Sequence, residues 1–568
     1  MRLIFLLIFV VGCSHQVNII SPPKHFSRAK YESTASGNMV ASQGEATSRA
    51  ALNILSNGGN IIDAFVAASF TISVERPQST GIGGGGFLLF YNHAENQVYA
   101  FDFREIAPLG SDSKMFLTKD GQSQPLLSQE GALAVATPGL VAGLYDIHKR
   151  FGRLPWKQTM AAAIELARRG FPLYDQLQVA LKDREHLLKV DPEAKKIFLN
   201  SDGTVPKLGT FIVQENLAKT LELIAEKGRD AFYHGKVAKA IVKTVHSKRG
   251  ILSLKDLKNY QMKVRTPVST HYKGLKVYSM PPPSSGGIHV IQILKMLEPH
   301  NLKSMGPQST EAVHLMANSM QRAFMDRATY LGDPDFHVVP VKELLEKTYL
   351  QRLSKEIDTD KAIKADQLKA VPLPYESSET THFTIADKDG NMVASTQTIN
   401  GWFGSGVIAQ GTGIILNNEM DDFAQKVGEQ NLFGAVGGNN NLVEANKRPL
   451  SSMSPTIITQ EDKPYMALGS PSGTRIITCV AQTILNTVEF KMPLFEAVAA
   501  TRIHQQWRPD VLKIEAPFLS EKVEKDLKAK GHNVIHDKLG CSIQAIKREN
   551  KKWTGVSDPR GEGLAIGN

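Results

Sequence analysis

The stretch from Glu379 to Asn391, ETTHFTIADKDGN, opens a strand-like pattern with two threonines and a histidine. An internal threonine hydroxyl is a weak nucleophile. An N-terminal threonine carries its own base, because an α-amine with a pKa of about 7.7–8.0 can accept the hydroxyl proton at neutral pH. Cleavage between Glu379 and Thr380 would therefore create a nucleophile at Thr380. A purely structural strand is the alternative interpretation, since threonine suits pleated surfaces.

The residues after the cleavage point predict a β-hairpin with strands at 380–386 and 392–399. Lys388-Asp389-Gly390-Asn391 supplies the turn, because Asp-Gly is a strong hairpin pair. A three-residue loop places Thr398 directly opposite Thr380, and a two-residue loop shifts the pairing by one position. Either register brings a second hydroxyl beside Thr380, where it can orient the nucleophile.

His382 lies on the same strand face as Thr380, but about 6–7 Å further along the strand. We therefore interpret His382 as structural, and Asp558 in the SDPR segment likewise. The glycines Gly81, Gly83 and Gly86 match G-x-G-x-x-G, yet a helical pattern precedes them and a strand pattern follows. A dinucleotide site needs the reverse order. These glycines are instead expected to let the backbone pass close to another segment.

The hairpin sequence, TTHFTIADKDGNMVASTQTIN, is one of seven motifs that follow one another along residues 39–560. The other six are FDFREIAP, PPPSSGG, GIILNNEMDDF, NKRPLSSMSPTI, GSPSGTRIIT and SDPR. Together these motifs resemble γ-glutamyltranspeptidase, a member of the N-terminal nucleophile hydrolases.

The resemblance implies an α+β fold, a four-layer αββα sandwich of the N-terminal nucleophile hydrolase type. It implies that the precursor cuts itself before Thr380 into a large subunit, 37–379, and a small subunit, 380–568, which remain together as a heterodimer. Thr380 would attack the γ-carbonyl of glutathione or another γ-glutamyl compound. The γ-glutamyl-enzyme would then pass its acyl group to water or to an acceptor amino acid or peptide.

Two sets of positions match those that hold the donor's glutamyl head group in the family. An arginine fork and hydroxyls suit a carboxylate, and amide or carboxylate oxygens suit an ammonium. The α-carboxylate set is Arg104, Ser451 and Ser452. The α-amino set is Asn400, Glu419 and Asp422. Taken alone, Arg104 and Asp422 could form a plain surface ion pair, and the serines could form a turn.

The oxyanion hole corresponds to the backbone N–H groups of Ser472 and Gly473 in GSPSG. The family usually has two glycines there, and a positive φ would be awkward for serine. A second departure is Phe433, where many relatives have a tyrosine on a loop that covers the pocket. Phenylalanine cannot hydrogen-bond to Asn400, so we expect a more mobile lid and more hydrolysis relative to transfer. The loop itself, Lys426–Asn440, is present and favours small donors.

Two other functions remain open. One is a related amidase, such as a cephalosporin acylase or a poly-γ-glutamate depolymerase. The other is a non-catalytic lipoprotein that is never processed. The intact set of Thr380, Thr398, Arg104 and Asp422 argues against the second, and the lid loop argues against the first.

Composition excludes several classes. The formal net charge of +10 is spread along 568 residues without a dense basic block, so nucleic-acid binding is not expected. The sequence has no metal-binding motif, and the predicted reaction needs no cofactor. Cys479 and Cys541 are far apart in the sequence and are expected to be buried free thiols.

The N-terminus, MRLIFLLIFVVGCSHQ, has a basic residue, a short apolar run and Gly12-Cys13. This pattern indicates a signal peptide at 1–12 that resembles a bacterial lipobox, with Cys13 as the lipidated residue and 13–36 as a tether. We therefore expect an exported periplasmic or cell-surface lipoprotein. Ser14, which follows the cysteine, favours the outer membrane.

Overall fold

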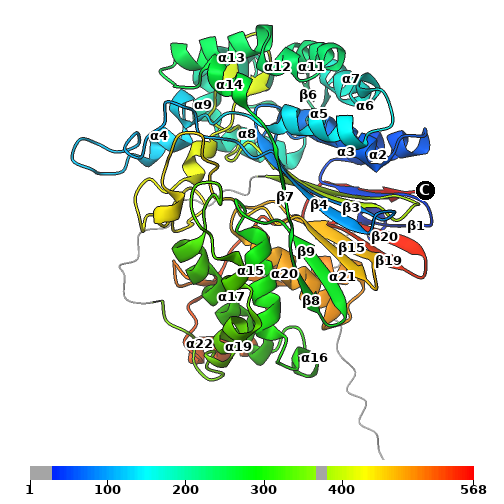
Figure 1. The fold of residues 1–568 in the computed structure, drawn as a ribbon, viewed down its shortest axis with the longest axis vertical. Coiled ribbons are helices and arrows are strands. Elements are labelled where there is room, and N and C mark those ends of the chain that lie inside the picture. Colours follow the sequence, from blue (N-terminus) through cyan, green and yellow to red (C-terminus); the bar gives the residue numbers. More distant parts are fainter. Residues whose placement is uncertain (1–27, 366–379) are drawn as a thin grey trace, which may run out of the picture.

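Two seven-stranded antiparallel sheets face each other at the centre of the computed structural model, which describes residues 28–365 and 380–568 (Figure 1). We call the sheet that contains the predicted hairpin the hairpin sheet. Its strands, in spatial order, are β21 (Leu564–Gly567), β2 (Met39–Ser42), β10 (Thr381–Ala386), β11 (Met392–Thr398), β3 (Gly85–Asn92), β4 (Gln97–Asp102) and β7 (Lys263–Arg265).

The second sheet lies beside the hairpin sheet and is also antiparallel throughout. Both sheets combine strands from before Thr380 with strands from after it. A cut before Thr380 would leave these backbone ladders intact. The order is β1 (Glu32–Ala35), β20 (Lys552–Ser557), β19 (Gln544–Glu549), β15 (Lys463–Gly469), β14 (Thr456–Gln460), β9 (Leu275–Ser279) and β8 (Val268–Tyr272).

Helices cover the outer face of each sheet (Figure 1). The hairpin sheet is covered mainly by α2 (Glu45–Ser56), α3 (Ile61–Glu75), α5 (Leu140–Phe151), α7 (Ala161–Arg169) and α11 (Glu215–Lys227). The second sheet is covered mainly by α15 (Gly286–Leu297), α17 (Thr310–Tyr330), α20 (Arg475–Val488) and α21 (Leu494–Ala499). The result is the predicted four-layer αββα sandwich.

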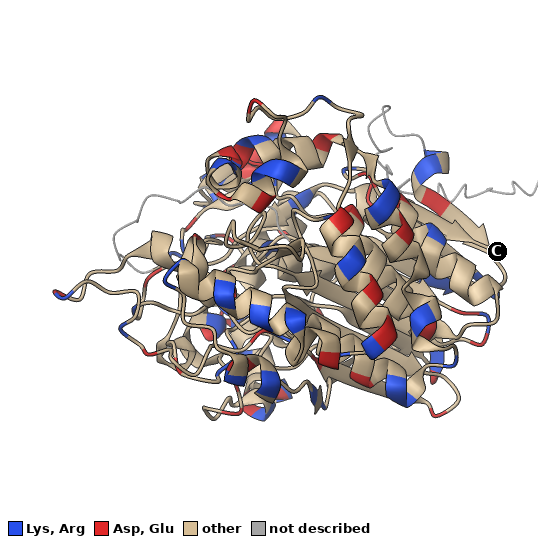
Figure 2. Cartoon of the chain, turned by 90° about the horizontal axis from the view of Figure 1, so that it is seen from above, with Lys and Arg blue, Asp and Glu red and all other residues tan. Residues whose placement is uncertain are grey.

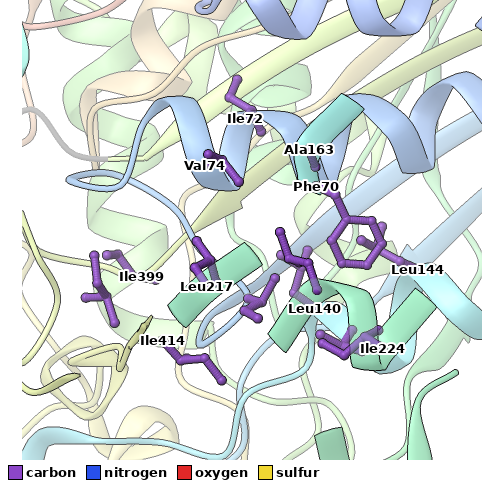
Figure 3. Packing of buried hydrophobic residues seen from close by; sticks show 14 of the residues in the cluster. Phe70, Ile72, Val74, Leu140, Leu144, Ala163, Leu217, Ile224, Ile399 and Ile414 are labelled. Atoms are coloured by element: carbon purple, nitrogen blue, oxygen red, sulfur yellow. The ribbon is translucent and has the colours of Figure 1, made fainter. Parts of the chain in front are cut away.

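Alternation along the strands explains the layers. In β3, Leu88 and Phe90 point into the core beneath α3, whereas Phe87 and Leu89 point into the core shared with the second sheet. Because successive side chains point to opposite faces, a strand that is apolar at every position must be covered on both sides. Figure 3 shows part of the core between the hairpin sheet and the helices that cover it, where side chains of α3, α5, α7 and α11 pack together.

The hairpin has the register of the three-residue loop. Thr381 pairs with Gln397 and Ala386 with Met392, so continuing the ladder sets Thr398 opposite Thr380. Asp387 N–H donates to Asn391 carbonyl oxygen at 3.2 Å and closes the loop. The β10–β11 pair lies inside the sheet, between β2 and β3, so its position is constrained from both sides.

The glycine-rich segment before β3 does bring two backbones together. A Cβ atom on Gly84 would lie 2.0 Å from the Thr398 carbonyl oxygen, and one on Gly83 would lie 2.1 Å from the Ile415 carbonyl oxygen. A side chain at Gly84 would push the end of β11 away, and one at Gly83 would push β13 (Ile414–Ile415) away. The expected close backbone approach is confirmed at Gly83 and at Gly86, where a Cβ atom would lie 2.4 Å from the Thr396 carbonyl oxygen, but not at Gly81, where the nearest atom would be 3.8 Å away. Helix α3 precedes the segment and strand β3 follows it, the reverse of a dinucleotide-binding loop.

Two expectations from the sequence are wrong. Cys479, on α20, and Cys541, before β19, form a disulfide with Cα atoms 6.7 Å apart, although 62 positions separate them. Their spacing could not reveal this, because only the packing of α20 on the second sheet brings them together. The proposed tether also ends too late, since α1 (Arg28–Tyr31) and β1 already belong to the fold. Cys13 lies outside the described residues.

Charge is distributed as the sequence indicates. Lysines and arginines are interspersed with acidic residues over the surface in Figure 2, without a single basic face. Within residues 28–365 and 380–568, no helix is long and apolar enough to cross a membrane. No cluster of three or more potential metal ligands occurs in the same ranges.

Candidate active site

Thr380 and Thr398 meet at one end of the hairpin. Their hydroxyl oxygens lie 3.3 Å apart, and both side chains are almost fully buried. Thr398 Oγ1 also accepts the N–H of Asn400 at 2.8 Å, which holds this hydroxyl in position. The two hydroxyls line one cavity. Thr398 can therefore orient the Thr380 hydroxyl, as the register predicts.

The backbone at Thr380 is strained. Its φ is +112°, a region that β-branched residues rarely adopt. Such a conformation is expected to cost roughly 1–3 kcal/mol and to persist only where the surroundings enforce it. Here the neighbouring ladder of β10 enforces it. Glu379, the other side of the predicted cleavage point, lies outside the described residues.

His382 is not a base for this nucleophile. Its ring is fully buried, with Nδ1 2.8 Å from Thr396 Oγ1, and it packs against Gly469, where a Cβ atom would lie 2.2 Å from the ring. Burial lowers the pKa of His382 to about 3, so the ring is neutral at any physiological pH. Its structural role agrees with the sequence prediction. Asp558 likewise lies outside the cavity, where it pairs with Arg502.

The predicted oxyanion turn lies at the start of α20. Ser472 has φ +104° and Gly473 has φ +51°, so serine occupies the awkward conformation anticipated for it. The Ser472 hydroxyl donates to the Leu539 carbonyl at 2.6 Å. In the described part of the chain, neither backbone N–H of this pair has an acceptor. Two free N–H groups at a helix N-terminus suit a developing negative charge.

Arg104 is the centre of a buried charge cluster. It follows β4, and its guanidinium pairs with Glu419 and Asp422, while its Nε donates to the Pro449 carbonyl at 3.3 Å. Burial lowers the pKa of Arg104, but the adjacent carboxylates outweigh that effect and raise it above its usual value. This is a buried ion pair in the cavity wall, and the surface ion-pair alternative does not hold.

Glu105 and Glu419 both lie within ion-pair distance of the Arg104 guanidinium. Burial raises the pKa of Glu105 to about 7 and the pKa of Glu419 well above its usual value, although Arg104 opposes both shifts. The pair therefore carries less than two full negative charges at neutral pH. Glu105 was not singled out from the sequence. Its place beside Arg104 in FDFREIAP is the signal that could have found it.

Ser451, Ser452 and Asn400 line the same cavity as the charge cluster. Asn400 Nδ2 donates to the Asn418 carbonyl at 3.0 Å. Ser452 Oγ accepts from a guanidinium nitrogen of Arg327 at 3.3 Å, and Arg327 Nε donates to Ser285 Oγ at 3.1 Å.

Arg327, on α17, is another residue that the sequence reasoning missed. Burial lowers the pKa of Arg327 to about 10, which still leaves it charged. Its partner Ser285 belongs to PPPSSGG, a motif that was recognised without a role for its serines.

The lid loop, Lys426–Asn440, covers the cavity. Phe433 is buried, and its ring packs directly on Gly473, where a Cβ atom would lie 2.4 Å from a ring carbon. Leu432 N–H donates to the buried carboxylate of Asp421 at 2.8 Å. Phe433 therefore covers the cavity by packing on Gly473, without a hydroxyl. Asp421 is a third functional candidate that the sequence did not reveal, masked by its neighbour Asp422.

The structure thus brings all but one of the predicted substrate and catalytic residues into one cavity. Ser472 contributes through the turn behind that cavity's wall and does not line it. The predicted residues that line it are Arg104, Thr380, Thr398, Asn400, Glu419, Asp422, Phe433, Ser451, Ser452 and Gly473, and its wall also includes Arg327, Asn431, Ala435, Met453, Thr474 and Ile476.

Comparison with known proteins gives a consistent answer. Residues 47–568 match the gamma-glutamyltranspeptidase family model. The chain is 42% identical to the glutathione hydrolase proenzyme of Escherichia coli over 92% of this chain and 90% of that protein. It is 37% identical to the Bacillus subtilis glutathione hydrolase proenzyme over 96% and 94% of the two chains.

Solved structures agree. A cephalosporin acylase from Bacillus halodurans superposes with a TM-score of 0.83 at 25% identity, covering 96% of this chain and 99% of that one. A chain of the Helicobacter pylori gamma-glutamyltranspeptidase superposes with a TM-score of 0.56 at 38% identity, covering 57% of this chain and 93% of that one.

Proposed function

Because the chain belongs to the gamma-glutamyltranspeptidase family, we propose that its cavity binds γ-glutamyl donors and that Thr380 is the nucleophile. The protein is a γ-glutamyltransferase and glutathione hydrolase made as a self-processing precursor. The observation that carries the assignment of Thr380 is the pair of threonine hydroxyls 3.3 Å apart in a cavity that also holds a buried arginine and acidic residues.

The first half-reaction forms an ester. After cleavage, the α-amine of Thr380 takes the proton of its own hydroxyl as Oγ1 bonds to the γ-carbonyl carbon of the donor. The N–H groups of Ser472 and Gly473 stabilise the resulting oxyanion. The tetrahedral intermediate collapses, the C–N bond breaks, and the ammonium of Thr380 gives its proton to the leaving amine. For glutathione the amine released is Cys-Gly.

The second half-reaction restores the enzyme. Water or an acceptor amine loses a proton to the α-amine of Thr380 and attacks the ester carbonyl. The ester C–O bond then breaks, and Thr380 Oγ1 recovers its proton. Water yields glutamate, and an amine yields a new γ-glutamyl compound. The same N–H pair serves both halves, because both pass through an oxyanion at one carbon.

The head group is held by complementary charges. The guanidinium of Arg104, with the hydroxyls of Ser451 and Ser452, suits the donor's α-carboxylate, and Glu419, Asp422 and Asn400 suit its ammonium. Arg104 itself pairs with Glu419 and Asp422. A carboxylate accepts several hydrogen bonds, so Asp422 can hold an ammonium without releasing Arg104. This arrangement favours zwitterionic glutamyl groups over simple amides and over uncharged acyl chains.

Intact mass of the purified protein tests the nucleophile. The wild-type protein is expected as two fragments that meet between Glu379 and Thr380, and a Thr380→Ala variant as one uncut and inactive chain. One uncut chain in both samples would remove the catalytic assignment. It would leave the fold and family untouched, because neither depends on processing.

We also propose that the protein is exported and anchored through a lipid on Cys13, at the outer membrane. The lipobox-like sequence supports this, and the disulfide of the small subunit supports an oxidising compartment. The mass of the N-terminal peptide tests the anchor. A diacylglycerol adduct at Cys13 is expected, and it should disappear in Cys13→Ser. An unmodified peptide that begins at another residue would contradict the proposal.

A further inference from the structure

One side chain joins the tip of the lid loop to the head-group site. Asn431 Nδ2 donates to Asp422 Oδ1 at 2.8 Å. Asn431 Oδ1 accepts the N–H groups of Phe433 and Ala435, each at 3.0 Å. The same amide therefore shapes the loop that carries Phe433 and binds the carboxylate that pairs with Arg104.

Two cavities meet at this hydrogen bond. The donor cavity contains Thr380, and a second cavity lies under the lid loop with neither threonine in its wall. The two cavities therefore share a wall at Asp422, the residue proposed to hold the donor's ammonium. The residues that line both cavities are Arg327, Asp422, Asn431 and Ala435.

The second cavity has a polar wall of mixed charge. Gln425, Gln430 and Asn441 supply amides to this wall, and Asp421, Asp422 and Glu429 supply carboxylates. Arg327 supplies a cation, and among the described residues no carboxylate lies within ion-pair distance of this guanidinium. A substituent on the donor's α-amine would point from Asp422 into this space. A preceding γ-linked glutamyl residue would place an amide there and a carboxylate near Arg327.

We propose that Asn431 is a specificity-determining residue, because its bond to Asp422 closes the donor cavity behind the α-amino group. A free ammonium fits the closed cavity and gives Asp422 a charged partner. An N-acylated γ-glutamyl donor needs the space beyond and enters only when the bond between Asn431 and Asp422 is broken. This inference rests on the proposed function and adds the class of donor that the site excludes.

Two substitutions separate the roles of the amide. Asn431→Ala removes both the bond to Asp422 and the acceptor that shapes the loop tip. Asn431→Asp keeps an oxygen for the N–H groups of Phe433 and Ala435 but replaces the hydrogen bond to Asp422 with repulsion between two carboxylates. Val427→Ala is the matched control, because Val427 is on the same loop, 50% exposed, and lines neither cavity.

The measurement is kcat/KM for γ-glutamyl-p-nitroanilide and for its N-acetyl derivative. The ratio of the two values is expected to fall by about tenfold or more in Asn431→Ala and in Asn431→Asp, as the loss of one hydrogen bond implies. It should stay unchanged in Val427→Ala. An unchanged ratio in both Asn431 variants would overturn the proposal, as would an equal fall in the control.

Processing on a denaturing gel accompanies each assay. A variant that no longer cleaves itself is replaced by Asn431→Ser, which is smaller and still polar. Loss of processing in all three Asn431 variants would show that the residue supports folding and would overturn a role in selectivity. Failure of the proposed function itself appears elsewhere: the wild-type enzyme would then release no p-nitroaniline from the unmodified donor.

Discussion

The hairpin that carries Thr380, the proposed nucleophile, and the part of the cavity proposed to hold the head group are built in opposite ways. Thr380 and Thr398 belong to adjacent strands inside a sheet, and backbone ladders on both sides hold them. Arg104, Asp422 and Asn431 come from three segments and are held by side-chain ion pairs and hydrogen bonds. The chemistry therefore rests on rigid backbone, whereas selectivity rests on side chains that single substitutions can change.

The largest expected effect is at the head-group end. Arg104→Gln would leave the buried acids Glu419 and Asp422 without their cation, and breaking a buried pair in this way costs about 3–5 kcal/mol. We expect poor self-processing, a lower urea midpoint of unfolding and lost donor binding. Arg104→Lys is the control, since it keeps the charge without the fork. Wild-type stability in Arg104→Gln would show that the cluster is not held together by this arginine.

Next in size is a change at the hairpin. Thr398→Val keeps the shape but removes the hydroxyl beside Thr380, and we expect kcat to fall about 100-fold, as for other single active-site hydrogen bonds. KM should change less than kcat, because Thr398 contacts the head-group residues only through its bond to the Asn400 N–H. Thr398→Ser should retain most of the activity. Equal activities of the valine and serine variants would contradict the orienting role of this hydroxyl.

The contribution of Asp421, which binds the lid loop, to the free energy of unfolding should depend on pH. Burial raises the pKa of Asp421 to about 6, above its value in the unfolded chain, so this residue's contribution to stability is lost as pH rises from about 4 to 6. Asp421→Asn removes that loss. In a Thr380→Ala background, which prevents subunit separation, the free energy of unfolding of the variant relative to its parent should rise by about 2 kcal/mol between pH 4 and pH 7. If the difference in free energy of unfolding between variant and parent does not change with pH, the prediction is wrong.

The smallest expected effect concerns Phe433. Phe433→Tyr adds a hydroxyl that can bond to Asn400, a gain of about 0.5–1.5 kcal/mol, and should shift the products from hydrolysis toward transfer. The ratio of transfer to hydrolysis with a fixed acceptor measures this. A shift no larger than experimental error would mean that the contact with Gly473 and the bond between Asn431 and Asp422 already hold the lid.

Sequence patterns predicted those parts of the site that depend on residues close together in the sequence. The Asp-Gly turn and the alternating strands placed Thr398 beside Thr380, since the ladder transmits register over a few residues. The glycines before β3 were correctly interpreted as a close approach. The αββα fold and the head-group residues came from family motifs. Periodicity alone could not connect Arg104 with Asp422, which lie more than 300 positions apart in the sequence.

The sequence by itself determined the family, the fold and the pairing of Thr380 with Thr398 across one hairpin. Only the tertiary structure decided the disulfide between Cys479 and Cys541, the burial of Arg327 and the link from Asn431 to Asp422. The physical reason is how far apart in the sequence the interacting residues lie. Strand register and turns depend on neighbours, so residue order reveals them. Distances, burial and the pKa values that follow from burial depend on segments that meet only after the sheets and helices have packed.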